Sequence, residues 1–174
     1  MAGQAAGEEM ALLRELVPKK PVSGVLVNAM IIGLQLALDK TLGLGSAAMT
    51  QLLVRNAEEF ASVLEALGII GEVSGEPERV IPRLFRDLGI SGRVEVERLN
   101  GKYRVRVWDS VFAPAAVYLG FRGVPYTINP EAFISAGVIS LYHRRATGRK
   151  PRLRVRVNPP RSKEDPLVVE IEVV

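Results

Sequence analysis

The last third of the chain shows the most regular alternation of hydrophobic and polar positions. Asn129 and Pro130 are residue types that begin helices, and Gly148 is the type that ends them in a left-handed conformation. After this helix, arginines alternate with apolar residues over 152–157, and glutamates alternate with apolar residues over 169–173. Successive side chains of a strand point to opposite faces. The pattern therefore predicts a capped helix and then two strands, each with one apolar and one charged face.

Residues 94–107 carry the strongest hairpin pattern, centred on Asn100-Gly101. Asn-Gly favours a two-residue type I′ turn, because both turn positions need positive φ. This turn places Val96 opposite Val105 on the apolar face and Glu97 opposite Arg104 on the charged face. A register shifted by one residue would bury the charges, so the alternation supports this pairing.

The last two strands give a similar pairing. Arg156 falls opposite Glu170, and Arg154 falls opposite Glu172. A shift of two residues would keep the same faces, so the pattern alone leaves this register open.

Helical periodicity dominates the first half of the chain. We expect an N-terminal amphipathic helix, a second helix over 23–42 that is apolar nearly all round, a third over 46–67, and a short one over 81–88. The order helices, hairpin, helix, hairpin predicts an α+β fold. Its four-stranded antiparallel sheet would be made of the two hairpins and packed against several helices.

At 174 residues, the chain suits a single domain over 1–174. We divide it into three parts: an N-terminal helix and linker over 1–21, a helical part over 22–90, and a hairpin-helix-hairpin part over 91–174.

The composition excludes several kinds of chemistry. The chain has no cysteine, so disulfides, thiolate metal sites and cysteine nucleophiles are ruled out. Its one histidine, His143, has no evident nucleophile or carboxylate partner in the sequence. We therefore expect no metal, no cofactor and no catalytic residue, and a non-enzymatic function is favoured over an enzymatic one.

The most apolar run, Val22 to Leu38, is short for a membrane span and contains Asn28 and Gln35. The N-terminus also lacks the basic, then apolar, pattern of a secretory signal. We expect a buried helix in a cytoplasmic protein without a membrane span. Few Asn and Gln residues, no Cys, and more Arg than Lys are typical of a thermophile.

The segment from Trp108 to Tyr126 holds five of the ten aromatic residues of the chain. It is expected either to pack helices onto the sheet or to form the wall of an apolar pocket, since ligand sites are lined mainly by apolar and aromatic groups. The candidate pocket residues are Leu34, Leu53, Phe60, Trp108, Phe112 and Tyr118.

A basic region near the C-terminus offers an alternative function. Nine Lys and Arg residues lie between Arg144 and Lys163, and a phosphate-binding surface needs such a cluster. Few aromatic residues are interleaved with them, and some face glutamates across the sheet, so solvated structural charge is the competing interpretation. The candidates for nucleic-acid binding are Arg144, Arg145, Arg149, Lys150 and Lys163.

The chain resembles the 4-vinyl reductase domain family, also described as hydrocarbon-binding domains and related to the TRAPP vesicle-tethering subunits. The resemblance lies in the helix from Glu131 through Gly137, the Leu153-Arg-Val-Arg-Val strand, and the closing Asp165-Pro-Leu-Val-Val-Glu-Ile-Glu-Val segment. It extends to the third helix and to Gly89-Ile-Ser-Gly-Arg-Val-Glu-Val, and covers about two-thirds of the chain. Members often carry cysteines in the last two strands, where this chain has residues such as Asn158 and Val169.

The resemblance implies an α+β domain that binds a small hydrophobic molecule and often dimerises. Any metal or thiol role of the missing cysteines is lost, whereas an apolar cavity is not excluded. We therefore expect a small-molecule-binding domain, sensory or regulatory, that forms a homodimer. A basic nucleic-acid-associated protein and a ligand-free assembly subunit are the alternatives.

Overall fold

The computed structural model describes residues 23–42, 46–66, 75–162 and 164–174. The helix expected within 1–21 and the candidate Lys163 lie outside these residues. The helices are α2 Gly24–Leu42, α3 Ser46–Arg55, α4 Ala57–Ala66, α5 Pro77–Asp87, α6 Ala113–Phe121 and α7 Pro130–Thr147. The strands are β1 Arg93–Leu99, β2 Lys102–Trp108, β3 Leu153–Asn158 and β4 Leu167–Val173.

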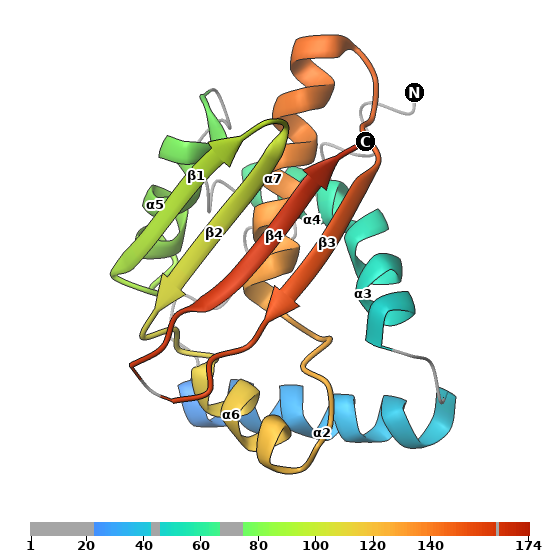
Figure 1. Ribbon diagram of the computed structural model, residues 1–174, viewed down its shortest axis with the longest axis vertical. Helices are drawn as coiled ribbons and strands as arrows, with labels where there is room; N and C mark the ends of the chain where they lie inside the picture. Colours follow the sequence, from blue (N-terminus) through green and yellow to red (C-terminus); the bar gives the residue numbers. More distant parts are fainter. Residues whose placement is uncertain (1–22, 43–45, 67–74, 163) are drawn as a thin grey trace.

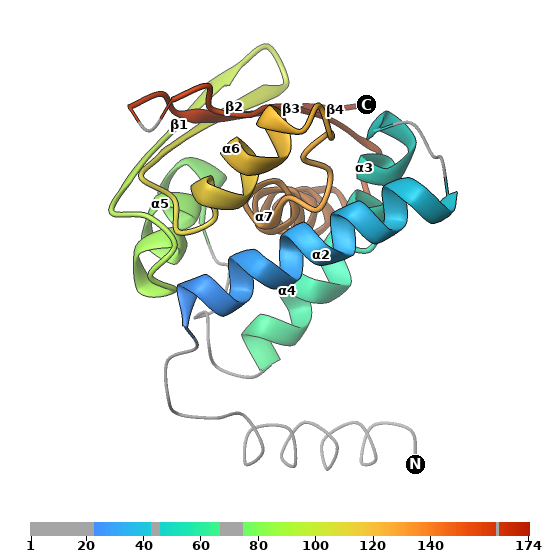
Figure 2. The same ribbon diagram turned by 90° about the horizontal axis from the view of Figure 1, so that it is seen from below.

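The four strands form one antiparallel sheet in the order β1-β2-β4-β3. The two hairpins therefore join through β2 and β4. Helices α5 and α7 lie against one face, whereas no described element covers the other (Figures 1 and 2). The predicted α+β class and the four-stranded antiparallel sheet are confirmed.

The first hairpin has the predicted turn and register. Asn100 and Gly101 have φ values of 51° and 78°, as a type I′ turn requires. Val96 pairs with Val105 and Glu97 with Arg104. Val105 is completely buried on the helix-covered face, so the alternation of the sequence matches the two faces of the sheet.

The second hairpin has the register in which Arg156 lies opposite Glu170 and Arg154 opposite Glu172. The helix that precedes it has the predicted ends. The side chain of Asn129 accepts a hydrogen bond from the Ala132 backbone N–H at 2.6 Å, and Gly148 is left-handed with φ of 73°.

Helix α7 is the centre of the molecule. Residues 134–141 are all buried between the sheet and helix α4. At Gly137, a Cβ atom would lie 2.4 Å from the backbone oxygen of Ala57 and 2.9 Å from the Ala61 Cβ atom. Glycine is thus required here, because the backbones of α4 and α7 approach too closely for any side chain.

Three expectations about the helices need correction. The helix expected over 46–67 is divided at Asn56 into α3, which packs beside β3, and α4, which packs on α7. Helix α6 was not predicted, because its sequence is apolar throughout and shows no polar face. The helix over 23–42 was expected to be buried, but α2 lies across one end of the molecule, packs against α6 and leaves Leu26 and Leu34 exposed (Figure 2).

Candidate ligand-binding site

The two buried polar side chains of α2 hold the segment around α6 in place. Asn28 donates from Nδ2 to the Val111 carbonyl oxygen at 2.7 Å and accepts at Oδ1 from the Ala115 N–H at 3.0 Å. Two turns further along, Gln35 Oε1 accepts from the Thr127 and Ile128 N–H groups at 3.2 and 2.9 Å. The inward face of α2 is therefore polar at two positions, and both bind backbone groups of the α6 segment.

Below the start of α6 lies a buried polar cluster formed by Ser110, Glu131 and Tyr126. The Ser110 hydroxyl donates to Glu131 Oε1 at 2.5 Å, and the Tyr126 hydroxyl donates to Oε2 at 3.3 Å. Glu131 is completely buried. Burial raises the pKa of its carboxyl group, while the hydrogen bonds from Ser110 and Tyr126 counteract only part of that rise. Burial beside Glu131 also raises the pKa of Tyr126.

This cluster borders an apolar pocket of about 520 Å³. Its lining comes from α6 and the two residues that follow β2: Asp109, Ser110, Ala113, Pro114, Val117, Tyr118 and Phe121. Phe121 is 86% exposed, so a large aromatic ring stands at the surface beside the pocket. The pocket combines apolar walls with a polar end at Asp109 and Ser110, a composition typical of small-molecule sites.

The acid–base groups near this cluster are few among the described residues. A serine nucleophile needs a base that removes its proton, and the carboxyl group hydrogen-bonded to Ser110 is that of Glu131. His143, which would be the other base, accepts or donates a 3.1 Å hydrogen bond with the Tyr103 hydroxyl near the opposite end of α7. Among the described residues, no cluster of His, Asp and Glu is suited to hold a metal ion.

The six predicted pocket residues are spread over the molecule. Tyr118 lines the apolar pocket, whereas the other five do not. Leu34 is 54% exposed on α2, Phe60 packs against Phe133 with ring centroids 4.8 Å apart, and Trp108 carries the Arg93 guanidinium 4.1 Å from its ring centroid. Leu53 and Phe112 are half-buried on α3 and just before α6.

Sequence reasoning missed Ser110 and Glu131 as members of one cluster. They are 21 positions apart, and their contact depends on how α7 packs under the segment before α6. The sequence did contain a signal for the inward face of α2. Asn28 and Gln35 interrupt this apolar helix at a spacing of two turns, so they lie on one face.

Most of the predicted nucleic-acid candidates form ion pairs with α4. Arg144 pairs with the buried Glu58 at 2.5 Å, Arg145 with Glu65 at 3.1 Å, and Lys150 with Glu59 at 3.0 Å. The bond to Lys150 lowers the pKa of Glu59. Arg149 is exposed. These pairs fasten the end of α7 and the following loop to α4, so they support structural charge over a phosphate-binding surface.

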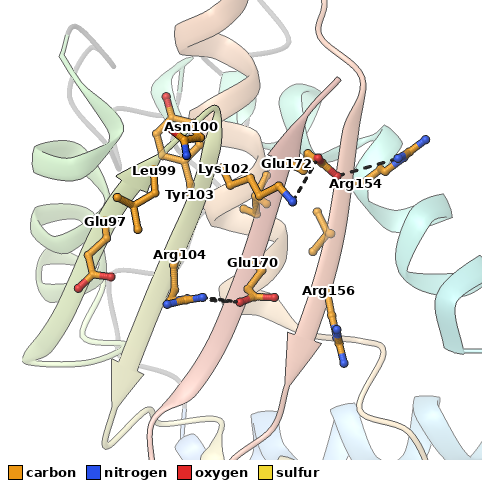
Figure 3. Close-up of a pocket in the computed structure, with 12 residues that line it drawn as sticks. Glu97, Leu99, Asn100, Lys102, Tyr103, Arg104, Arg154, Arg156, Glu170 and Glu172 are labelled. Atoms are coloured by element: carbon orange, nitrogen blue, oxygen red, sulfur yellow. Dashed lines mark hydrogen bonds and ion pairs between the residues drawn. The ribbon is translucent and has the colours of Figure 1, made fainter.

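The open face of the sheet carries charged side chains in stripes that alternate in sign (Figure 3). Glu170 on β4 pairs with Arg104 on β2 at 3.1 Å, and Glu172 pairs with Lys102 at 3.4 Å. The hollow of about 610 Å³ over this face is therefore lined by charges that compensate one another. We regard this face as solvated and structural.

Helix α2 has the length and composition of a membrane span over Gly24–Thr41, with a mean hydropathy of 1.2, and 17% of these residues are buried. Among the described helices, it alone meets these criteria. Its exposed apolar side chains include Val25, Leu26, Met30 and Leu34.

The fold and the pocket define a small α+β domain with an apolar hollow at one end. The chain is 35% identical over 162 residues to "Uncharacterized protein MJ0312" of Methanocaldococcus jannaschii, a match that covers 86% of this chain and 77% of the relative. The chain belongs to the same protein family as this archaeal relative.

No known family profile matches the chain, so its resemblance to 4-vinyl reductase domains stays a prediction. Among solved structures, the chain is similar to a trafficking protein particle complex subunit 3 from Naegleria fowleri, covalently bound to palmitic acid. The identity is 14%, the TM-score is 0.27, and the match covers 98% of this chain and 93% of the other. A likeness of this strength supports no inference about function.

Proposed function

We propose that this protein is a non-enzymatic binding domain for a small hydrophobic molecule, with the site in the apolar pocket beside α6. The observation that carries the proposal is the pocket's combination of apolar walls with a single polar end. Its volume of about 520 Å³ lies within the usual range of small-molecule sites, roughly 300–1,000 Å³. A sensory or regulatory role fits a domain that binds a ligand without transforming it.

The polar end indicates the chemistry of the ligand. Ser110 Oγ donates to Glu131 and accepts from the Phe112 N–H at 3.1 Å, so its position is fixed from two sides. Because the Ser110 proton is donated to Glu131, Ser110 Oγ can only accept a further hydrogen bond. A ligand with an apolar body and one hydroxyl group would place that hydroxyl beside Ser110 and its body against Val117 and Phe121. A purely polar ligand would make no favourable apolar contacts with these walls.

The test is the uptake of N-phenyl-1-naphthylamine, a neutral apolar dye whose fluorescence rises in apolar surroundings. We expect saturable binding by the wild-type protein. Ala113 lines the pocket, and Ala113→Phe would fill it and abolish the fluorescence increase. The matched control is Ala48→Phe, which adds the same ring at an exposed position on α3 away from the pocket.

Both variants must keep the wild-type melting temperature within a few degrees. Equal dye binding by Ala113→Phe and the wild-type protein would contradict the proposed site. As a second measurement, native mass spectrometry of protein purified under mild conditions would report the mass of any molecule that the wild-type protein retains and Ala113→Phe does not.

We also propose that the protein forms a homodimer through α2. The exposed fractions of Val25, Leu26, Met30 and Leu34 are 82%, 53%, 57% and 54%, which is unusual for neighbouring apolar side chains of one helix. If a second copy packs its own α2 against these residues, the same apolar face of each copy is covered, as in a two-fold interface.

A further inference from the structure

A second hollow, distinct from the apolar pocket, lies between α3, the end of α7 and β3. Its volume is about 710 Å³. Four cationic side chains line it: Arg55 from α3, Lys150 from the loop after α7, Arg152 before β3, and Arg154 from β3. We call this hollow the basic pocket. It brings together residues from parts of the chain that are about a hundred positions apart.

The charges of the basic pocket are only partly neutralised. Lys150 pairs with Glu59 at 3.0 Å, and Arg154 reaches Glu172 at 4.0 Å, a carboxylate that Lys102 also approaches (Figure 3). Within the described part of the chain, the side chains of Arg55 and Arg152 have no acidic partner. The basic pocket therefore differs from the end of α7, where Arg144 is matched by Glu58.

The wall between these cations is held in a defined geometry. The Gln51 side-chain amide faces the free edge of β3. In the amide orientation that satisfies both groups, its nitrogen donates to the Leu153 oxygen and its oxygen accepts from the Val155 N–H, each at 3.1 Å. This side chain bonds to the strand as a neighbouring peptide group would. On the other side, Ser140 is buried and donates to Glu58. The Gln51 contact fixes α3, which carries Arg55, against β3, which Arg152 directly precedes.

We propose that the basic pocket binds a small phosphorylated molecule. Guanidinium groups form paired, charge-assisted hydrogen bonds to phosphate oxygens, and Arg55 and Arg152 are free to do so. The volume suits a compact ligand. None of the lining residues is aromatic, whereas proteins that track single-stranded nucleic acid use aromatic side chains to stack the bases. The site is independent of the apolar pocket, so the two proposals stand or fall separately.

The test measures the binding of inorganic pyrophosphate to the full chain. Calorimetry gives the affinity, and changes in amide chemical shifts locate the site. We expect saturable binding, with shifts centred on the Gln51 side-chain amide and the backbone of Arg152 and Leu153. The double variant Arg55→Ala, Arg152→Ala should weaken binding by about tenfold or more, because two charge-assisted contacts are lost.

The matched control is Arg79→Ala, Arg83→Ala. It removes the same charge from two exposed positions on α5, and we expect less than a threefold change, since exposed charges at a distance are screened by salt. Three results would overturn the proposal: equal loss of affinity in both double variants, shifts centred on Arg144 and Arg145, or preferred binding of a single-stranded DNA oligomer that both variants weaken alike.

Discussion

Helices α2 and α7 have similar sequences in one respect: both are long and show little separation of apolar and polar faces. Their places in the molecule are opposite. Residues 134–141 of α7 are buried between the sheet and α4, and Gly137 lets the backbones of α4 and α7 approach closely. Helix α2 lies across one end, turns Asn28 and Gln35 inward, and leaves Leu26 and Leu34 exposed.

The difference shows that an apolar helix is not necessarily a core helix. What distinguishes α7 is a position at which only glycine fits, together with strong signals at both ends. What distinguishes α2 is that its few polar side chains bind backbone groups of another segment. Two buried amides thus predict the inward face of α2 better than its apolar residues do, because buried polar groups must find partners.

The largest test of this comparison is a methyl group added to a glycine of each helix. Gly137→Ala in α7 should lower the free energy of unfolding by about 3 kcal/mol, because the new Cβ atom would collide with the Ala57 backbone. Gly33→Ala in α2 meets nothing within 4 Å and should raise it by about 0.5–1 kcal/mol. Urea unfolding measures both, and similar values for the two variants would contradict the contrast.

The next test compares one substitution on the inward polar face of α2 with one on its outward apolar face. Gln35→Ala should reduce the free energy of unfolding by about 2 kcal/mol, since the N–H groups of Thr127 and Ile128 lose their acceptor. Leu34→Gln changes the exposed neighbour and should alter it by less than about 0.5 kcal/mol at low protein concentration. A larger loss of stability from Leu34→Gln than from Gln35→Ala would indicate that Leu34, and not Gln35, lies on the buried face of α2.

A smaller effect is expected from a charge placed on the outer face of α2, and it concerns dimer formation. Met30→Glu would introduce two facing carboxylates into a two-fold contact, and the dimer dissociation constant should rise about tenfold or more. Light scattering after gel filtration would detect the fall in mass. Ala48→Glu, with the same charge change on α3, serves as the control. A wild-type protein that remains monomeric at high concentration would disprove the α2 dimer.

The smallest effect concerns His143 near the end of α7. Burial lowers the pKa of His143 from its ordinary value of 6.5, so the folded protein favours the neutral ring. Its contribution to stability is present above the unfolded pKa and is lost as the pH falls through the lower folded pKa. His143→Gln should therefore show a shallower loss of stability than the wild-type protein between about pH 7 and 5.

The comparison for His143 is made as a difference between the two proteins, because Glu131 acts in the opposite direction. Its raised pKa adds stability at low pH that is lost as the pH rises through the folded value. That contribution is common to both proteins and cancels. Parallel pH profiles for wild-type and His143→Gln would show that the burial of the ring has no thermodynamic consequence.

Part of the candidate site was present in the sequence. The aromatic segment from Trp108 to Tyr126 includes α6, and Tyr118 was a predicted pocket residue that lines the apolar pocket. The other five candidate residues do not line this pocket, and Leu34 is exposed because α2 lies at one end of the molecule. Ser110 and Glu131 could not be paired from the sequence, since nothing local links a turn after β2 with the first turn of α7.

The sequence by itself determined the two hairpins, the register of the first and the ends of α7. These features depend on neighbours in the chain: an Asn-Gly turn sets its own φ values, alternation assigns two faces, and caps satisfy nearby backbone groups. Only the tertiary structure decided that β2 pairs with β4, that the third helix divides at Asn56, and that α2 faces outward. Those outcomes depend on which apolar surfaces meet and which buried polar groups find partners, and such contacts join residues far apart in the chain.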